Sequence, residues 1–479
     1  MRYTRPTRRL TATLAAGVLV IAACGGDDDA APDTTPTTTA VGESDTQQES
    51  DTQQESDPHQ ESGEESSATG NEQIVTGPGS YSIDLDDCPT GYDPTGGMSD
   101  TEIVLGSSAP QSGNFAAFAV INEGAQAYFD YVNEELGGLD GRSIRFETMD
   151  DGYEPARTVN NVTELIERQG IFATMGIVGT PNNLAVRDQL NEQCIPQLFA
   201  TTGASEWGEV DEFPWTMGSI VSYEAEAAIY ANYIQQEFPD GATVGLLVMN
   251  NDFGRSYQDG FLKAIEGTDI EIVEEQFVEA AAPSVANEIT TLASSDADVL
   301  MGFVSGAICP QMMATVAQAS WEPMTFLSST CSSVVSFFAP VDPAGDGVLV
   351  INYRKDPTDP DAQSDPDMQL YLEKMAQYAP NTNAQSTTTS LGWALAALFV
   401  ETAERAIETD GELTRPGLMV AMMSLDSQVG MLLDGISWQT DGVDDPWPIE
   451  QARIARYTYD DDAGAGSMVG ISDVIDFRN

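Results

Sequence analysis

Residues 101–155 constrain the fold more than any other part of the chain. Residues 103–105 (Ile-Val-Leu) form a short apolar run that stops at Gly106, which is typical of a buried parallel strand. Apolar residues then recur every three or four positions over residues 118–136, and Gly137-Gly138 closes this helical pattern before a second strand. The stretch predicts a β–α–β unit. We expect the loop at residues 107–114 to border a ligand site, because ligands bind at the carboxyl ends of parallel strands.

The same alternation of strands and helices continues to about residue 328. Short apolar runs predict further strands, at residues 171–176, 195–199, 243–249, 270–277, 299–304 and 325–328. Polar loops follow several of them, at residues 179–183, 200–204 and 250–254. The pattern restarts near Pro214 and the two runs join near residue 220. A chain of 479 residues is also too long for one compact core, so two similar lobes are expected.

The charge balance excludes several classes of partner. Asp and Glu number 77 against 19 Lys and Arg, which gives a formal net charge of −58. Nucleic acid and anionic lipid headgroups would be repelled by such a surface. The single histidine, His59, lies in a low-complexity tract. This excludes Ser-His-Asp and Cys-His catalytic sites and metal sites built from histidines. We therefore expect no enzyme activity, no cofactor and no metal site.

The amino terminus predicts an exported, lipid-anchored protein. Several arginines precede the apolar run at residues 14–23, which is too short to span a membrane, so residues 1–23 read as a signal peptide. Residues 21–25 (Ile-Ala-Ala-Cys-Gly) resemble a bacterial lipobox, and the resemblance implies cleavage before Cys24 and lipidation of its thiol. The alternative is an ordinary cleaved signal followed by an incidental cysteine.

An acidic linker follows, within a predicted region of residues 24–98 that also includes an extension before the first lobe. Hexads begin at Glu43, Glu49 and Glu55, and the linker to about residue 72 has almost no apolar residues. Such a segment cannot bury a core, and we expect it to be disordered. A solvated spacer is favoured over calcium binding by the acidic repeats.

The remaining cysteines predict disulfides. An even number remains for an oxidising compartment once Cys24 is set aside: Cys88, Cys194, Cys309 and Cys331. Position along the chain favours pairing Cys88 with Cys194 and Cys309 with Cys331, because each pair then falls within one presumed lobe. The alternative is a set of buried free thiols.

The order of motifs resembles a known family. The matching segments are IVLGSSAPQSG, NEELGGLDGRSIRFETMDDGYEPARTVNNVTELIE, GTPNN, ATTGAS, VMNNDFGRS and SLGWALAALFVETAERA. They resemble the leucine/isoleucine/valine-binding class of substrate-binding proteins of ABC importers, over residues 101–477. The resemblance implies an α/β type I periplasmic-binding fold of two Rossmann-like lobes, each a parallel sheet flanked by helices.

The family fold also implies a three-crossing hinge between the lobes. The crossings would lie near Ser219, Ile351 and Val429. The first lobe would then contain residues 99–220 and 352–429, and the second lobe residues 221–351 and 430–479. Ligand would sit between the lobes and be enclosed when they close.

Candidate ligand-binding residues follow from the same resemblance. Thr180 matches a position whose hydroxyl holds a ligand carboxylate, and Ala200 and Thr202 match positions that bind the same head group. Phe118 and Phe253 match aromatic residues that cover the ligand. The full set of candidates is Ser112, Phe118, Thr180, Ala200, Thr201, Thr202, Phe253 and Thr330. As alternatives, the two threonines could cap helices and the two phenylalanines could be core residues.

Some acidic residues remain open to two interpretations. Thr330 falls where amino-acid binders carry a Glu for the ligand ammonium, so either the ligand is not a free α-amino acid or the ammonium partner is Glu224 or another acid. Asp150 and Asp151 resemble a catalytic carboxylate pair, but a structural role is preferred over a hydrolase. Trp393 is interpreted as part of a helix core.

The combined prediction is an extracytoplasmic solute-binding protein of an ABC importer. It would bind a small polar metabolite, such as an amino acid or amide, and deliver it to permease subunits. Its contact with the membrane would be the lipid anchor alone. The alternative is an extracellular ligand-sensing domain that signals through a membrane partner.

Overall fold

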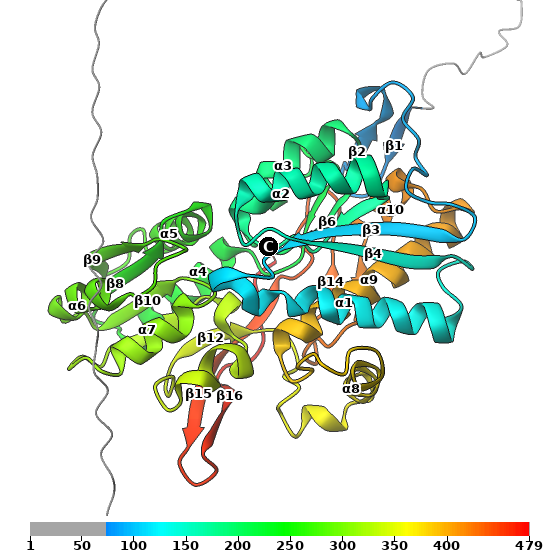
Figure 1. Ribbon diagram of the computed structural model, residues 1–479. Coiled ribbons are helices and arrows are strands. Elements are labelled where there is room, and N and C mark those ends of the chain that lie inside the picture. The colour runs from blue at the N-terminus through cyan, green and yellow to red at the C-terminus, as the bar shows by residue number, and fades with distance from the viewer. Residues whose placement is uncertain (1–72, 479) are drawn as a thin grey trace, which may run out of the picture. The chain divides into compact units, whose positions relative to one another are not determined.

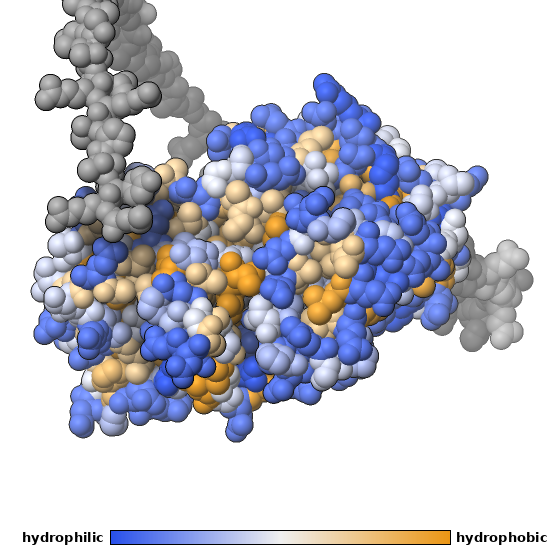
Figure 2. Space-filling model, turned by 60° about the horizontal axis from the view of Figure 1, so that its bottom comes forward, coloured by the Kyte–Doolittle hydropathy of each residue, from blue (hydrophilic) through white to orange (hydrophobic). Residues whose placement is uncertain are grey.

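A computed structural model of the chain describes residues 73–478 (Figure 1). The predicted signal peptide, the lipidation site at Cys24 and the hexad repeats lie outside these residues. Among the described helices, none is both long and apolar enough to cross a membrane. Hydrophilic residues prevail on the face shown in Figure 2, as the acidic composition leads one to expect.

The first sheet is parallel and has the strand order β4-β3-β5-β6-β7. Its strands are β3 (Glu102–Ala109), β4 (Ser143–Asp150), β5 (Ala173–Met175), β6 (Gln197–Ala200) and β7 (Thr216–Gly218). The helices between them are α1 (Val120–Tyr131), α2 (Pro155–Glu164) and α3 (Thr180–Glu192). This sheet and the helices packed on it are called the first lobe. The predicted β–α–β unit at residues 101–155 is confirmed.

The second sheet has the order β16-β15-β12-β11-β10-β8-β9, with β17 paired to β15. Its parallel strands are β8 (Ala242–Met249), β9 (Ile270–Val278), β10 (Val299–Phe303), β11 (Met324–Leu327) and β12 (Leu349–Asn352). Three antiparallel strands extend it: β15 (Gln451–Asp460), β16 (Ala465–Gly470) and β17 (Ile475–Asp476). The helices of this second lobe are α4 (Tyr223–Glu237), α5 (Asp252–Ala264), α6 (Ala286–Ser294) and α7 (Ile308–Val316). The two-lobed α/β fold is thus confirmed.

Late segments of the chain complete the first lobe. After β12 the chain forms α8 (Pro366–Tyr378), α9 (Thr387–Asp410) and α10 (Arg415–Met422), and α9 lies beside α1 in Figure 1. A Cβ atom on Gly392 would lie 1.7 Å from the carbonyl oxygen of Ile121, and one on Gly124 would lie 2.1 Å from that of Thr389. Only glycine permits this approach of the two helices. Residues 387–400 of α9 are all buried, and Trp393 packs against Tyr128, as the core interpretation predicted.

The first strand is longer than predicted. The apolar run stops at Gly106, but β3 continues to Ala109 and buries Ser107 and Ser108. Gly106 does not end the strand, because its lack of a side chain leaves room for Leu165 and Ile171, which would lie about 3.0 Å from a Cβ atom there. The Ser108 hydroxyl donates to the buried carboxylate of Asp151, so a polar residue is tolerated within the strand.

Residues 73–98 are folded and cover the first lobe. They form the hairpin of β1 (Ile74–Thr76) and β2 (Ser82–Asp84), and Tyr81 and Ile83 are buried. A disulfide joins Cys88 to Cys194, and a second joins Cys309 to Cys331. Both predicted pairings are therefore confirmed.

Residues 438–447 make their contacts with the first lobe and this extension. The short strand β14 (Trp438–Gln439) pairs with β13 (Asp426–Ser427), and the amide of Gly442 donates to the Met423 carbonyl. The amide of Val443 donates to the Gly79 carbonyl. We therefore propose that the third crossing lies just before β15 rather than near Val429.

Candidate ligand-binding site

The two lobes meet at the segment that follows β3. The 3-10 helix η2 (Gly113–Phe118) carries Asn114, whose side-chain amide donates to the carbonyls of Ala280 and Ala282 at 3.0 and 3.2 Å. The amide of Ala307 donates to the Asn114 carbonyl at 2.8 Å. The predicted loop at residues 107–114 therefore ends in a contact with the second lobe.

A small cavity lies where segments of both lobes converge. Its volume is about 40 Å³, and its walls come from η2 and α1, the loop after β6, the connection after β7, the segment after β11, the residues after β12 and the start of α9. The predicted residues Phe118, Thr201 and Thr330 all line it. Apolar walls are supplied by Ile121, Ile220, Tyr353 and Leu391.

Arg354 also lines this cavity, and the sequence analysis missed it. The residue is 9% exposed, and its Nη1 atom has no hydrogen-bond partner among the described residues. Its guanidinium carbon lies 5.2 Å from the ring centre of Tyr353. One signal could have found it, because Arg354 lies two residues after a buried strand at a predicted hinge crossing in a chain with few basic residues.

Thr180 and Thr202 lie close together but do not line the cavity. Their hydroxyls are 2.7 Å apart and fully buried, and the Ala204 amide donates to Thr202 Oγ1 at 3.2 Å. Ala200 ends β6, and its carbonyl accepts from the Ser219 hydroxyl at 3.2 Å. Burial raises the pKa of Tyr223, although hydrogen bonds to Thr202, Gly203 and Thr180 oppose this effect. These polar groups therefore satisfy one another.

Phe253 and Ser112 also lie outside the cavity lining. Phe253 is buried beside Tyr223 and Tyr257, at ring-centre distances of 5.3 and 5.2 Å, in the packing of α4 on α5. Ser112 is exposed, and its hydroxyl donates to Asp150 at 2.8 Å. Both residues remain predictions as ligand contacts.

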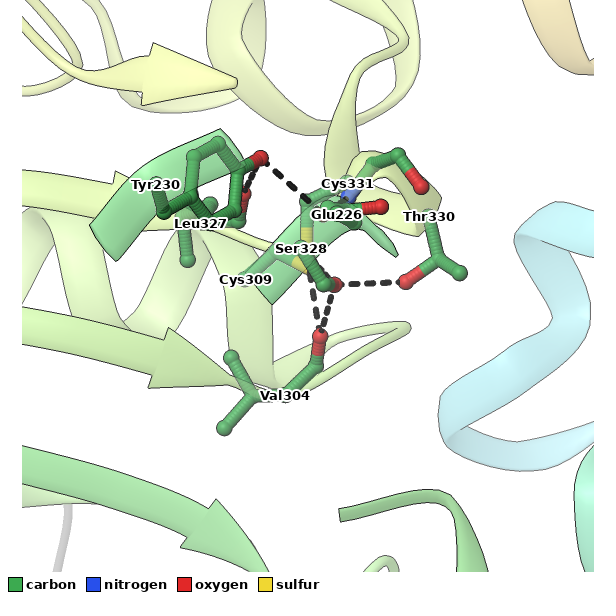
Figure 3. The surroundings of a disulfide bond; sticks show 9 residues. Glu226, Tyr230, Val304, Cys309, Leu327, Ser328, Thr330 and Cys331 are labelled. Atoms are coloured by element: carbon green, nitrogen blue, oxygen red, sulfur yellow. Dashed lines mark hydrogen bonds between the residues drawn. A yellow bond between two sulfur atoms is a disulfide. The ribbon is translucent and has the colours of Figure 1, made fainter. Parts of the chain in front are cut away.

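The disulfide of the second lobe holds the cavity-lining segment at residues 329–332. Figure 3 shows Cys309 bonded to Cys331, with Ser328 beside them. The Ser328 hydroxyl donates to the Val304 carbonyl at 2.6 Å, so the Thr330 hydroxyl, 2.7 Å away, donates to Ser328 in turn. Thr330 therefore projects away from the disulfide with its position fixed.

Glu226 binds the backbone of the same segment through a hydrogen bond. It is fully buried, and its carboxylate accepts from the Ser329 amide at 2.8 Å and from the hydroxyls of Tyr230 and Tyr257 at 2.9 Å each. Burial raises its pKa to about 7 against the opposing effect of these hydrogen bonds. Glu224, the acid considered for a ligand ammonium, instead pairs with Lys263 at the surface.

Residues 102–462 match the model of a family described as periplasmic binding protein. The chain belongs to the periplasmic binding protein family. The match spans most of the sequence and includes the first sheet, the second sheet apart from β16 and β17, and the residues that line the cavity. The members of this family bind solutes and are not enzymes, which confirms the prediction that the chain is not an enzyme.

Solved structures show the same fold at low sequence identity. A branched-chain amino acid ABC transporter protein from Thermus thermophilus with bound valine superposes with a TM-score of 0.68 at 18% identity, covering 79% of this chain and 97% of that one. A fatty acid ABC transporter substrate-binding protein from Thermomonospora curvata gives 0.66 at 20% identity, covering 81% and 96%. A Rhodopseudomonas palustris solute-binding protein in complex with 4-hydroxybenzoate gives 0.65 at 17% identity, covering 79% and 98%.

The paired carboxylates of this periplasmic binding protein have structural partners. Burial works to raise the pKa of Asp150, but hydrogen bonds from Ser112, Gln111 and Gly152 outweigh it and lower the pKa to about 2. Asp151 is buried, which raises its pKa, and its carboxylate accepts from the hydroxyls of Ser108 and Thr158. Both acids therefore organise the turn between β4 and α2.

Proposed function

We propose that this protein is the lipid-anchored, extracytoplasmic solute-binding component of an ABC importer. The solute is a small metabolite, such as an amino acid, an amide or a similar compound, enclosed between the two lobes. The observation that carries the proposal is the small cavity whose walls come from both lobes and from the segments that connect them. A site built in this way changes shape when the lobes move, which couples binding to closure.

The export and anchoring part of the proposal rests on the sequence. The lipobox-like residues around Cys24 and the acidic linker after them support a tether that holds the folded lobes away from the bilayer. The relatives named above belong to ABC transporters, which supports delivery to permease subunits.

We further propose distinct roles for the candidate site residues. Phe118, Thr201 and Thr330 contact the ligand directly, because they line the cavity. Thr180, Ala200 and Thr202 are buried outside its lining and have a packing role, whereas Phe253 and the exposed Ser112 remain predictions as ligand contacts. The lobes correspond to residues 99–220 with 352–449, and 221–351 with 450–479.

A thermal-shift screen tests this function. The chain from Gly25 to Asn479 would be mixed with amino acids, amides, ureas, polyamines and carboxylates. A ligand present at one hundred times its Kd adds about 2.7 kcal/mol to the free energy of unfolding, which gives a shift of a few degrees. If folded protein showed no shift with any compound, the small-metabolite function would be contradicted.

A blocking variant connects any hit to the cavity. Thr330→Trp places a large ring at the cavity wall, where the half-buried Thr330 leaves room for the substitution. We expect the ligand-induced shift to disappear while the unliganded protein still unfolds cooperatively. Thr290→Trp, on the exposed face of α6, is the matched control. An unchanged shift in the folded Thr330→Trp variant would place the ligand elsewhere.

A further inference from the structure

Arg354 presents its guanidinium to the small cavity where segments of the two lobes converge. Its side chain is 9% exposed, and Nη1 has neither a hydrogen-bond acceptor nor a salt-bridge partner among residues 73–478. A buried charge without a partner is costly, so a fold retains one where something else completes it. Arginine presents fixed donors that match the two oxygens of a carboxylate.

The backbone holds Arg354 in place. The Arg354 amide donates to the side chain of Asn352 at 3.0 Å, and the next amide, that of Lys355, donates to the Met431 carbonyl at 2.8 Å. The residue thus lies between two neighbouring chain segments at the connection of the lobes. The backbone from which the Arg354 side chain extends is therefore held in place.

The acids near Arg354 have other partners. Asp356 accepts from the amide and the hydroxyl of Thr358 at 2.8 and 2.7 Å, and the charge of Arg354 partly opposes the rise in its pKa on burial, but the two residues make no salt bridge in the described structure. Glu226 accepts from three donors and does not line the cavity. No Asp or Glu lines the cavity among the described residues. The lining thus carries a positive charge and no acceptor carboxylate for an ammonium group.

We propose that the ligand is an organic monocarboxylate without an α-ammonium group, and that Arg354 binds its carboxylate. The apolar part of the ligand packs against Phe118, Ile121 and Leu391. This inference rests on the proposed function and narrows its ligand class. It differs from the family-based prediction, in which Thr180 and Thr202 hold the carboxylate, because those hydroxyls already bond to each other.

Matched probes separate the carboxylate from the ammonium. Isovalerate, isovaleramide and valine share one branched carbon skeleton, and benzoate with benzamide provides an aromatic pair. Titration calorimetry with the chain from Gly25 to Asn479 should show binding of at least one of the two acids. The corresponding amide, which lacks the charge, and valine, which adds the ammonium, should each bind roughly 10- to 100-fold more weakly.

Variants of Arg354 provide the second part of the test. Arg354→Met should raise the Kd of the bound acid roughly 10- to 100-fold. Arg354→Lys should retain part of the affinity, because lysine keeps the positive charge but lacks the paired N–H donors of the guanidinium. Without ligand, Arg354→Met should unfold at the wild-type temperature or above, since it removes a buried unpaired charge. Arg168→Met, at an exposed arginine of the first lobe, is the control for the change in net charge.

The outcomes distinguish this inference from the proposed function. Equal binding of an acid and its amide, or unchanged affinity in Arg354→Met, would overturn the role of Arg354. A lower unfolding temperature for unliganded Arg354→Met with unchanged affinity would assign Arg354 a structural role. That result would also overturn its proposed role in binding the carboxylate. If only an amide, an amino acid or a cation from the wider screen binds, the ligand class is wrong while the proposed function stands. If nothing binds to folded protein, the proposed function itself is contradicted.

Discussion

At the scale of single residues, Glu226 links the stability of the protein to pH. Its carboxylate has no exposed surface, and its pKa is raised from 4.5 to about 7 by burial. Between these values the unfolded chain releases a proton that the folded chain keeps. The contribution of Glu226 to the free energy of unfolding therefore falls by about 3 kcal/mol in total as the pH rises from about 4.5 to about 7.

The variant Glu226→Gln tests this linkage. Urea unfolding between pH 5 and pH 8 should show a stability that falls less steeply with pH in Glu226→Gln than in the wild type. A constant offset between the two is expected because the amide cannot accept all three hydrogen bonds. Glu237→Gln, at an exposed position on the same helix, is the control for the change from Glu to Gln. Equal slopes in the wild type and Glu226→Gln would contradict the prediction.

Single residues are also where sequence-based prediction was weakest. Arg354 stands in a stretch rich in Asp and Pro, which is typical of an exposed loop, yet it is buried and lines the cavity with Thr201 and Thr388 from distant parts of the chain. Glu226 lies two residues after Glu224 in the same helix, yet one is buried and the other is paired at the surface. Neither difference follows from local sequence, because both arise from the packing of one element on another.

At the scale of elements, the two disulfides have separate tasks. The bond between Cys88 and Cys194 closes a separation of 106 residues and fastens the amino-terminal extension to the first lobe. The bond between Cys309 and Cys331 closes only 22 residues, but it holds the segment that lines the cavity. Stability and ligand binding should therefore respond differently to the loss of each bond.

Paired alanine variants test this separation. By loop entropy, Cys88→Ala with Cys194→Ala should lower the free energy of unfolding by about 5 kcal/mol, and Cys309→Ala with Cys331→Ala by about 3 kcal/mol. Ligand affinity should stay unchanged in the first variant and fall in the second. Urea unfolding and a titration with the same ligand measure both effects. Loss of affinity in the first variant alone would reverse the assignment.

Elements were predicted well where periodicity was strong. The apolar runs at residues 243–249 and 299–304 correspond to β8 and β10 within one residue at each end. The error at β3 arose because Gly106, Ser107 and Ser108 look like a loop, whereas helix α2 and its continuation pack against the glycine and Asp151 bonds the second serine. The antiparallel strands β15 and β16 were not predicted; β15 pairs with β12, about a hundred residues earlier in the chain, and β16 joins the sheet only through its pairing with β15.

At the scale of the whole molecule, the net charge of −58 opposes the approach of an anionic ligand. If Arg354 binds a carboxylate, the association rate should rise several-fold as salt increases from about 10 to about 150 mM, because the screening length falls from about 30 to about 8 Å. The dissociation rate should change little, since the contact with Arg354 is buried. Stopped-flow kinetics with the tightest acid probe measures both rates. An association rate that falls with salt would indicate a locally positive entrance instead.

The order of the elements along the chain limits when each lobe can finish folding. The glycine contact between α1 and α9 joins residues near position 124 to residues near position 392, and β15 inserts residues 451–460 into the second sheet. Neither lobe can therefore finish folding until most of the polypeptide has been synthesised and delivered. A partial chain lacks the last helix of one lobe and the edge strands of the other. Completion of both lobes thus depends on residues near position 392 and on residues 451–460, which are made late in synthesis.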